Sequence, residues 1–166
     1  THVLLTHGHA DHIADAVALC KRTGATAAAQ VEVANWLGER GVENTLDPNL
    51  GGTVRFDWGW AKLVQAFHTN TMPGSADAPF SATHGTAVGQ AAGWVVEIGG
   101  KTVYHAGDTC LFGDMQLIAQ RTPVDVAILP IGGHYTMDRH DAAYAAGLIG
   151  AATVIPCHYD TFPPIE

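Results

Sequence analysis

Short apolar runs alternate with stretches of helical periodicity in the first part of the chain. Residues 3–5 predict a short buried strand that ends just before a group of histidines. Apolar residues then recur at helical spacing over residues 12–23, which predicts a helix that ends at Gly24. A second strand is expected over residues 25–29, although alanine is a poor strand former. Residues 31–40 again have the pattern of a helix.

Turn-forming residues divide the middle of the chain. Residues 44–52 are rich in Asn, Asp, Pro and Gly, which is typical of a loop. Two strands are expected next, over residues 53–56 and 62–67. Residues 69–89 have little periodicity and predict a long loop, and long loops in compact domains are often functional.

The second half of the chain has the clearest signals. Gly99 and Gly100 separate two strand-like runs, which predicts a β-hairpin with a tight primed turn. Asp138 is suited to cap the last helix. The expected elements are strands over 93–98, 101–105, 124–130 and 153–156, and helices over 112–120 and 138–149. Their alternation predicts an α/β architecture.

Composition places the chain among globular proteins. With 166 residues, of which 47% are hydrophobic and 14% charged, it is long enough to form one domain (residues 1–166) with a substantial core. Eight Lys and Arg against 16 Asp and Glu give a net charge of −8, which disfavours a broad basic surface for nucleic acid. No apolar run approaches the length of a membrane span.

The three cysteines carry little signal, whereas histidine is unusually abundant. Cys20, Cys110 and Cys157 are widely spaced and odd in number, which indicates neither a disulfide framework nor a Cys-type zinc site. They suit a reducing compartment, and we expect the protein to be cytoplasmic. The ten histidines outnumber the eight Lys and Arg residues.

The densest histidine cluster is Thr-His-Gly-His-Ala-Asp-His at residues 6–12. Three imidazoles and a carboxylate are costly to bury unpaired, but together they suit Zn, Fe, Ni or Mn. Gly8 and Ala10 are small enough to let the backbone curl around an ion. A solvated loop or an expression tag is the alternative, which the position between a strand and an amphipathic helix disfavours.

These residues resemble the signature of the metallo-β-lactamase superfamily, whose members are hydrolases with an αβ/βα sandwich fold. The signature is His-x-His-x-Asp-His, here at residues 7–12. Further motifs agree in order: AFH at 66–68, YHAGDT at 104–109, LPIG at 129–132 and IPCHY at 155–159. Together they are similar to the branch of metal-dependent hydrolases that includes L-ascorbate-6-phosphate lactonase.

The resemblance implies a centre of two divalent metal ions, with Zn favoured and Mn, Fe or Ni as alternatives. The implied ligands are His7, His9 and His68 for the first ion, Asp11, His12 and His158 for the second, and Asp108 bridging the two. Two such ions about 3.5–4 Å apart share a water and lower its pKa, which supplies hydroxide at neutral pH. Asp11 would also be catalytic, by orienting this water or accepting its proton.

Several assignments have alternatives. His84 competes with His68 for the third imidazole of the first ion, and His68 is favoured because it ends a predicted strand. Asp108 could instead be a turn residue. His158 could be a histidine of the core.

A second set of residues is expected around the ligands. Asp15, one helical turn beyond Asp11, is expected to accept a hydrogen bond from a ligand imidazole, unless it faces solvent. His105 is expected to point inward from its strand and support a ligand. Asp141 is a further candidate, although helix capping also explains it. His134 is the candidate general acid or anion-binding residue, with a surface histidine as the alternative.

The predicted function is hydrolysis of a small anionic ester, phosphodiester or lactone. A nuclease of the same superfamily, an iron oxidoreductase and a metal-binding module without turnover are the alternatives. The expected partners are a small anionic substrate and further copies of the chain, with neither membrane nor nucleic acid. Superfamily members have strands before the signature and a helix after the last histidine, so both ends of the sandwich are expected to be incomplete here. We expect the N-terminal strands in a separate chain or a longer parent protein, and an exposed apolar sheet edge in their absence.

Overall fold

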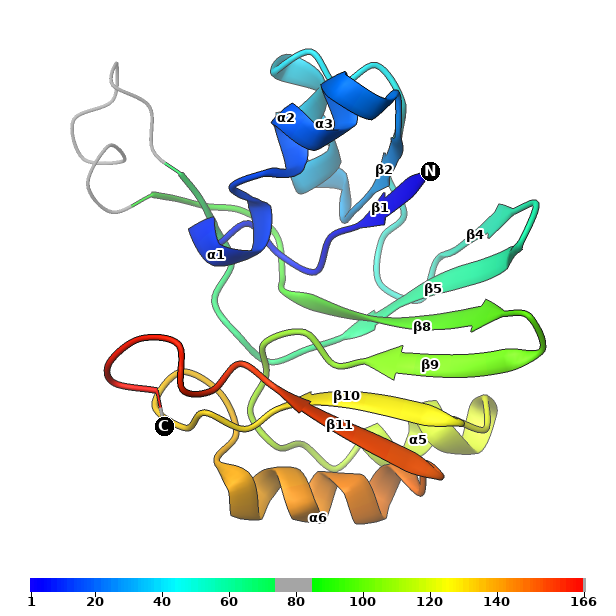
Figure 1. Ribbon diagram of the computed structural model, residues 1–166, viewed down its shortest axis with the longest axis vertical. Coiled ribbons are helices and arrows are strands. Elements are labelled where there is room, and N and C mark those ends of the chain that lie inside the picture. The colour runs from blue at the N-terminus through cyan, green and yellow to red at the C-terminus, as the bar shows by residue number, and fades with distance from the viewer. Residues whose placement is uncertain (74–84, 166) are drawn as a thin grey trace.

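Two β-sheets lie face to face, and helices cover the outer face of each (Figure 1). The computed structural model describes residues 1–73 and 85–165. The order of layers is helix, sheet, sheet, helix, so the predicted αβ/βα sandwich is confirmed. Among the described residues, no helix combines the length and the hydropathy that crossing a membrane requires.

The N-terminal sheet has three parallel strands in the order β1-β2-β3. Its elements are β1 (His2–Leu4), α1 (Ala10–Ile13), α2 (Ala16–Thr23), β2 (Thr26–Ala28), α3 (Val31–Glu39) and β3 (Thr45–Leu46). Ala27 and Ala28 in β2 have no exposed surface. Ala27 packs in one apolar cluster with residues of α2 and α3, and this burial outweighs the low strand propensity of alanine.

The second sheet has six strands in the order β11-β10-β9-β8-β5-β4. Its elements are β4 (Thr53–Phe56), β5 (Gly59–Gln65), β8 (Ala92–Ile98), β9 (Lys101–His105), α5 (Met115–Arg121), β10 (Val126–Pro130), α6 (Arg139–Ile149) and β11 (Thr153–Cys157). Strands β4 to β9 pair antiparallel, whereas β9, β10 and β11 are parallel. Gly99 and Gly100 have φ of 60° and 75°, so the turn between β8 and β9 has the positive φ values that primed turns require.

The space between the sheets is filled by an apolar cluster around Trp94. Leu63 from β5 and Ala28 from β2 belong to the same cluster. The Trp94 indole Nε1 donates a hydrogen bond of 2.9 Å to the Leu5 carbonyl. This bond ties the chain that leaves β1 to the centre of the second sheet, directly before the histidine cluster.

Three expectations about elements need correction. The single helix predicted over 12–23 is two helices, which are separated by a turn at Ala14 and Asp15. The predicted loop 44–52 contains the short strand β3, which pairs with β2. The predicted long loop is bounded by a small antiparallel pair, β6 (Thr71–Met72) and β7 (Thr86–Ala87), and its central residues lie outside the described part. Periodicity does not reveal such short pairings, because they depend on neighbours distant in sequence.

Strand β11, at one edge of the second sheet, exposes apolar side chains. Val154 and Ile155 there are 40% and 46% exposed. The outer strands of the N-terminal sheet, β1 and β3, are only three and two residues long.

Candidate metal centre

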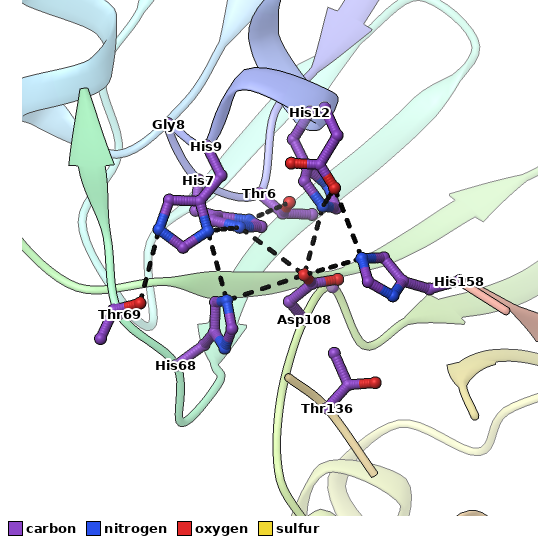
Figure 2. A network of polar contacts seen from close by, with 12 residues as sticks. Thr6, His7, Gly8, His9, His12, His68, Thr69, Asp108, Thr136 and His158 are labelled. Carbon is purple, nitrogen blue, oxygen red and sulfur yellow. Dashed lines mark hydrogen bonds and ion pairs between the residues drawn. The ribbon is translucent and has the colours of Figure 1, made fainter. Parts of the chain in front are cut away.

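The predicted ligands all lie just beyond strand ends that meet at one side of the sandwich (Figure 1). The chain leaving β1 carries His7 and His9, and α1 follows with Asp11 and His12. The other three come from the second sheet: His68 follows β5, Asp108 follows β9 and His158 follows β11. Residues from both sheets therefore converge on one site (Figure 2).

Three imidazoles form the first group, which we call the imidazole group (His7, His9 and His68). His9 Nδ1 lies 3.1 Å from His7 Nε2 and 3.3 Å from His68 Nε2. His7 is completely buried, while the other two are partly exposed. His68 thus lies with His7 and His9, while its competitor His84 lies outside the described residues, so the choice between the two stays a prediction.

Two carboxylates and two imidazoles form the second group, which we call the mixed group (Asp11, His12, Asp108 and His158). Asp11 Oδ2 lies 3.2 Å from His12 Nε2 and 3.4 Å from His158 Nε2. Asp108 Oδ2 lies 3.3 Å from each of the same two nitrogens. Its side chain is only 5% exposed, against 48% for Asp11.

The Asp108 carboxylate also contacts the imidazole group. Its Oδ2 atom lies 3.7 Å from His68 Nε2 and 3.9 Å from His7 Nε2 (Figure 2). One oxygen thus lies between the two groups, which is the position a ligand shared by two ions would need.

The surroundings give the two groups different protonation. Burial, followed by the neighbouring His12, lowers the pKa of His7 to about 3. Burial likewise lowers the pKa of His9 and His68, so these imidazoles are neutral at pH 7. The pKa of His12 is raised, because the two carboxylates outweigh the opposing effect of burial. Burial would raise the pKa of Asp108, but the adjacent imidazoles, His12 above all, hold it below its usual value.

A buried nitrogen of the site lacks a good hydrogen-bond partner in the described part of the chain. His12 Nε2 is buried and has no hydrogen-bond partner among the described residues, although two carboxylate oxygens lie nearby. Imidazole nitrogens and carboxylate oxygens that converge in this way are the ligands that divalent metal ions such as Zn²⁺ prefer. Within each group, one donor atom per residue lies within 4.8 Å of all the others, so each group could hold a metal ion.

Comparison with known proteins agrees with this geometry. A family model described as "Beta-lactamase superfamily domain" matches residues 1–159. The chain belongs to the beta-lactamase superfamily. Within it, the chain is a member of the UPF0173 metal-dependent hydrolases. It is 47% identical over 164 residues to such a protein of Shouchella clausii, covering 99% of this chain and 70% of that relative. A homologue from Staphylococcus aureus is also 47% identical, with the same coverage.

A solved structure of this superfamily is similar as well. Igni18, described as a novel metallo hydrolase from Ignicoccus hospitalis, has a TM-score of 0.83 and 38% sequence identity. The match covers 99% of this chain and 66% of Igni18, so the chain spans just under two thirds of that relative. Sequence and fold therefore place it with metal-dependent hydrolases of the beta-lactamase superfamily.

The second set of predicted residues lies further from the two groups. Asp15 is exposed at the start of α2, and Asp141 is exposed on α6. His105 Nδ1 accepts a hydrogen bond of 3.0 Å from the Gly107 amide, one residue before Asp108. None of the three has a recorded hydrogen bond to a residue of either group, so their supporting roles stay predictions.

His134 lies on the loop between β10 and α6, in the left-handed region with φ of 47°. It lines a cavity of about 570 Å³ together with Gly132, Arg139 and His140. No member of the two groups lines this cavity. Asp138 caps α6 as predicted, because its side chain accepts hydrogen bonds from the backbone amides of His140 and Asp141.

Sequence reasoning missed Asn70, which contacts the backbone between His7 and His9. Its Oδ1 accepts a hydrogen bond of 2.8 Å from the Gly8 amide. The only hint in the sequence is a polar residue two positions after His68, and nothing local links it to Gly8, 62 residues away.

Proposed function

We propose that this chain carries the two-metal centre of a hydrolase that acts on a small anionic ester, phosphodiester or lactone. The observation that carries the proposal is the position of Asp108, whose Oδ2 atom contacts both the imidazole group and the mixed group. As part of the same proposal, the chain belongs to the branch of the superfamily that includes L-ascorbate-6-phosphate lactonase.

In this proposal, each group would hold one divalent ion, and Asp108 would be a ligand of both. Neutral imidazoles combined with carboxylates suit Zn²⁺ best, while Mn, Fe or Ni would accept the same ligands. The unpartnered nitrogen of His12 and the convergence of seven donor atoms support this assignment. When bound, the ions supply Lewis acidity and lower the pKa of a water.

Asp11 is proposed to hold and move a proton at this centre. Its side chain is half exposed, so Asp11 can exchange a proton with solvent, unlike the buried Asp108. Its Oδ2 atom faces both imidazoles of the mixed group. A carboxylate that is both near the reacting water and open to solvent is suited to act as a general base.

The anionic substrate class rests on charge and on the residues at the rim. Two divalent cations outweigh the charges of Asp11 and Asp108, so the centre would be positive within a chain of net charge −8, which favours a small anion that reaches the metals. His134 is proposed to bind that anion or to protonate the leaving group. The three free cysteines support a cytoplasmic location as part of the same proposal.

Metal analysis combined with hydrolysis assays tests the proposal. The purified protein is stripped of metal, reloaded with Zn²⁺ or Mn²⁺, and assayed with bis-p-nitrophenyl phosphate and with a panel of lactones. We expect about two ions per chain and turnover that depends on them. His140→Ala is the matched control, because His140 is an exposed histidine outside both groups.

Two bound ions without turnover on any substrate would favour the metal-binding module over the hydrolase. Absence of binding after reconstitution would overturn the centre itself. Equal loss of metal in His140→Ala and in variants of the two groups would show that the groups are not the site.

A further inference from the structure

The Asn70 side chain connects segments that lie far apart in the sequence. Asn70 is 6% exposed and lies between His68 and β6. Its Oδ1 accepts from the Gly8 amide at 2.8 Å, and its Nδ2 donates to the Gln90 carbonyl at 3.1 Å. Its own carbonyl accepts from the Val88 amide at 3.0 Å. The residue thus joins the histidine loop, the segment after His68 and the approach to β8.

The contact at Gly8 is closely fitted. A Cβ atom at Gly8 would lie 2.2 Å from Met72 Sδ and 2.9 Å from the Thr71 carbonyl oxygen. The peptide between the two histidines therefore packs directly against residues 70–72. Because Gly8 is buried, its amide depends on Asn70 for a hydrogen-bond partner.

The amide side chain serves both contacts through two separate atoms, an acceptor oxygen and a donor nitrogen. The Gly8 amide requires an acceptor, whereas the Gln90 carbonyl requires a donor. An aspartate would keep the first bond and lose the second, and a leucine of similar volume would lose both.

We propose that Asn70 is a positioning residue that holds the His7-Gly8-His9 segment in register with His68, so that all three imidazoles reach one metal ion. This inference rests on the metal centre proposed above. Bonds from imidazole nitrogen to zinc are about 2.0–2.1 Å long, so a small shift of Gly8 relative to His68 weakens binding. The mixed group makes no recorded hydrogen bond to Asn70, and its metal affinity is expected to be independent of it.

Gln30 provides a matched control. It is 5% exposed, and its Oε1 accepts a hydrogen bond of 2.9 Å from the Gln90 amide. It is therefore a buried amide bonded to the same residue as Asn70, but it has no recorded side-chain hydrogen bond to the histidine loop or to His68. The Gln30→Leu variant therefore removes a hydrogen bond at Gln90 but leaves the bond from the Gly8 amide to Asn70 in place.

The test compares Asn70→Leu, Asn70→Asp and Gln30→Leu with the unsubstituted protein by Zn²⁺ titration against a chromophoric chelator. We expect Asn70→Leu to raise the Kd of one of the two Zn²⁺ ions by about 10–100-fold, and Gln30→Leu to leave both within about threefold. Asn70→Asp keeps the acceptor for the Gly8 amide, so its Kd for Zn²⁺ should lie between those of the other two variants. Should Asn70→Leu fail to fold, Asn70→Asp carries the comparison with Gln30→Leu.

Hydrogen exchange of the Gly8 amide in the metal-free protein gives a second readout. It should be slow in the unsubstituted protein and in Gln30→Leu, and fast in Asn70→Leu. Unchanged Zn²⁺ binding in the Asn70 variants, or an equal loss in Gln30→Leu, would overturn the positioning role. If the unsubstituted protein binds no Zn²⁺, the proposed centre is wrong, and the exchange data still decide whether Asn70 holds Gly8.

Discussion

The imidazole group and the mixed group lie side by side, but they are prepared for a metal in different ways. Burial keeps His7, His9 and His68 neutral, so their nitrogens offer lone pairs without first losing a proton. In the mixed group two carboxylates stabilise the protonated form of His12, which must lose that proton before it binds a metal. His7 and His12 lie close together in the sequence, so the difference shows that identical side chains acquire distinct chemistry from their surroundings.

Substitution of the one residue that the groups share should have the largest effect. Asp108→Asn removes the charge from the carboxylate that contacts both groups, and we expect the Zn²⁺ content to fall below two and kcat/KM to drop by about 10³-fold, since metal ions contribute several kcal/mol to charge stabilisation. Metal analysis and steady-state kinetics measure both. Asp125→Asn is the control, because that carboxylate pairs with Lys101 instead. Full metal content in Asp108→Asn would remove the basis for a shared ligand.

Single histidine substitutions should separate the groups. His68→Ala is expected to release the ion of the imidazole group and His158→Ala that of the mixed group, each with a loss of activity of about 10²-fold, because a metal site that loses a ligand binds weakly. Metal analysis should find about one ion in each variant, and spectra of Co²⁺-loaded protein should differ between the two. His84→Ala should keep both ions; a loss there equal to that in His68→Ala would reopen the assignment of the third imidazole.

The pH dependence of metal binding should sharpen the contrast. The raised pKa of His12 means that protons compete with metal at the mixed group at a higher pH than at the imidazole group. Between about pH 5 and 8, the affinity of the mixed group should fall earlier on acidification, by up to about tenfold per pH unit for each displaced proton. Chelator titrations across this range measure it. Parallel pH profiles for the two ions would contradict the difference in protonation.

The smallest effect is expected on the stability of the metal-free protein. His7 has its pKa lowered to about 3 in the folded state, so the unfolded chain takes up protons first as the pH falls below 6.5. Stability should therefore decrease between pH 6.5 and about 3, with His9 and His68 adding to the trend. Thermal melts should show a fall in midpoint of about 2–4 °C per kcal/mol. A His7→Asn variant should show a shallower decline, and an equally steep one would point to other groups.

Much of this molecule could be predicted from local patterns. The hairpin at Gly99 and Gly100 and the Asp138 cap each depend on neighbouring residues, and both predictions are confirmed. The short strand β3 could not be predicted, since it depends on pairing with β2 rather than on periodicity, and the apolar pattern over 12–23 did not reveal the break between α1 and α2.

The site shows the same division. The histidine cluster at residues 6–12 already indicated a metal centre, because closely spaced histidines and aspartates have few other uses, and the resemblance to the metallo-β-lactamase superfamily implied seven candidate ligands. Only the tertiary structure decided which atoms meet: that Asp108 lies between the groups, that burial depresses the pKa of His7, and that Asn70 holds Gly8. Distance and desolvation depend on segments that approach each other across the two sheets, and no local pattern in the sequence encodes them.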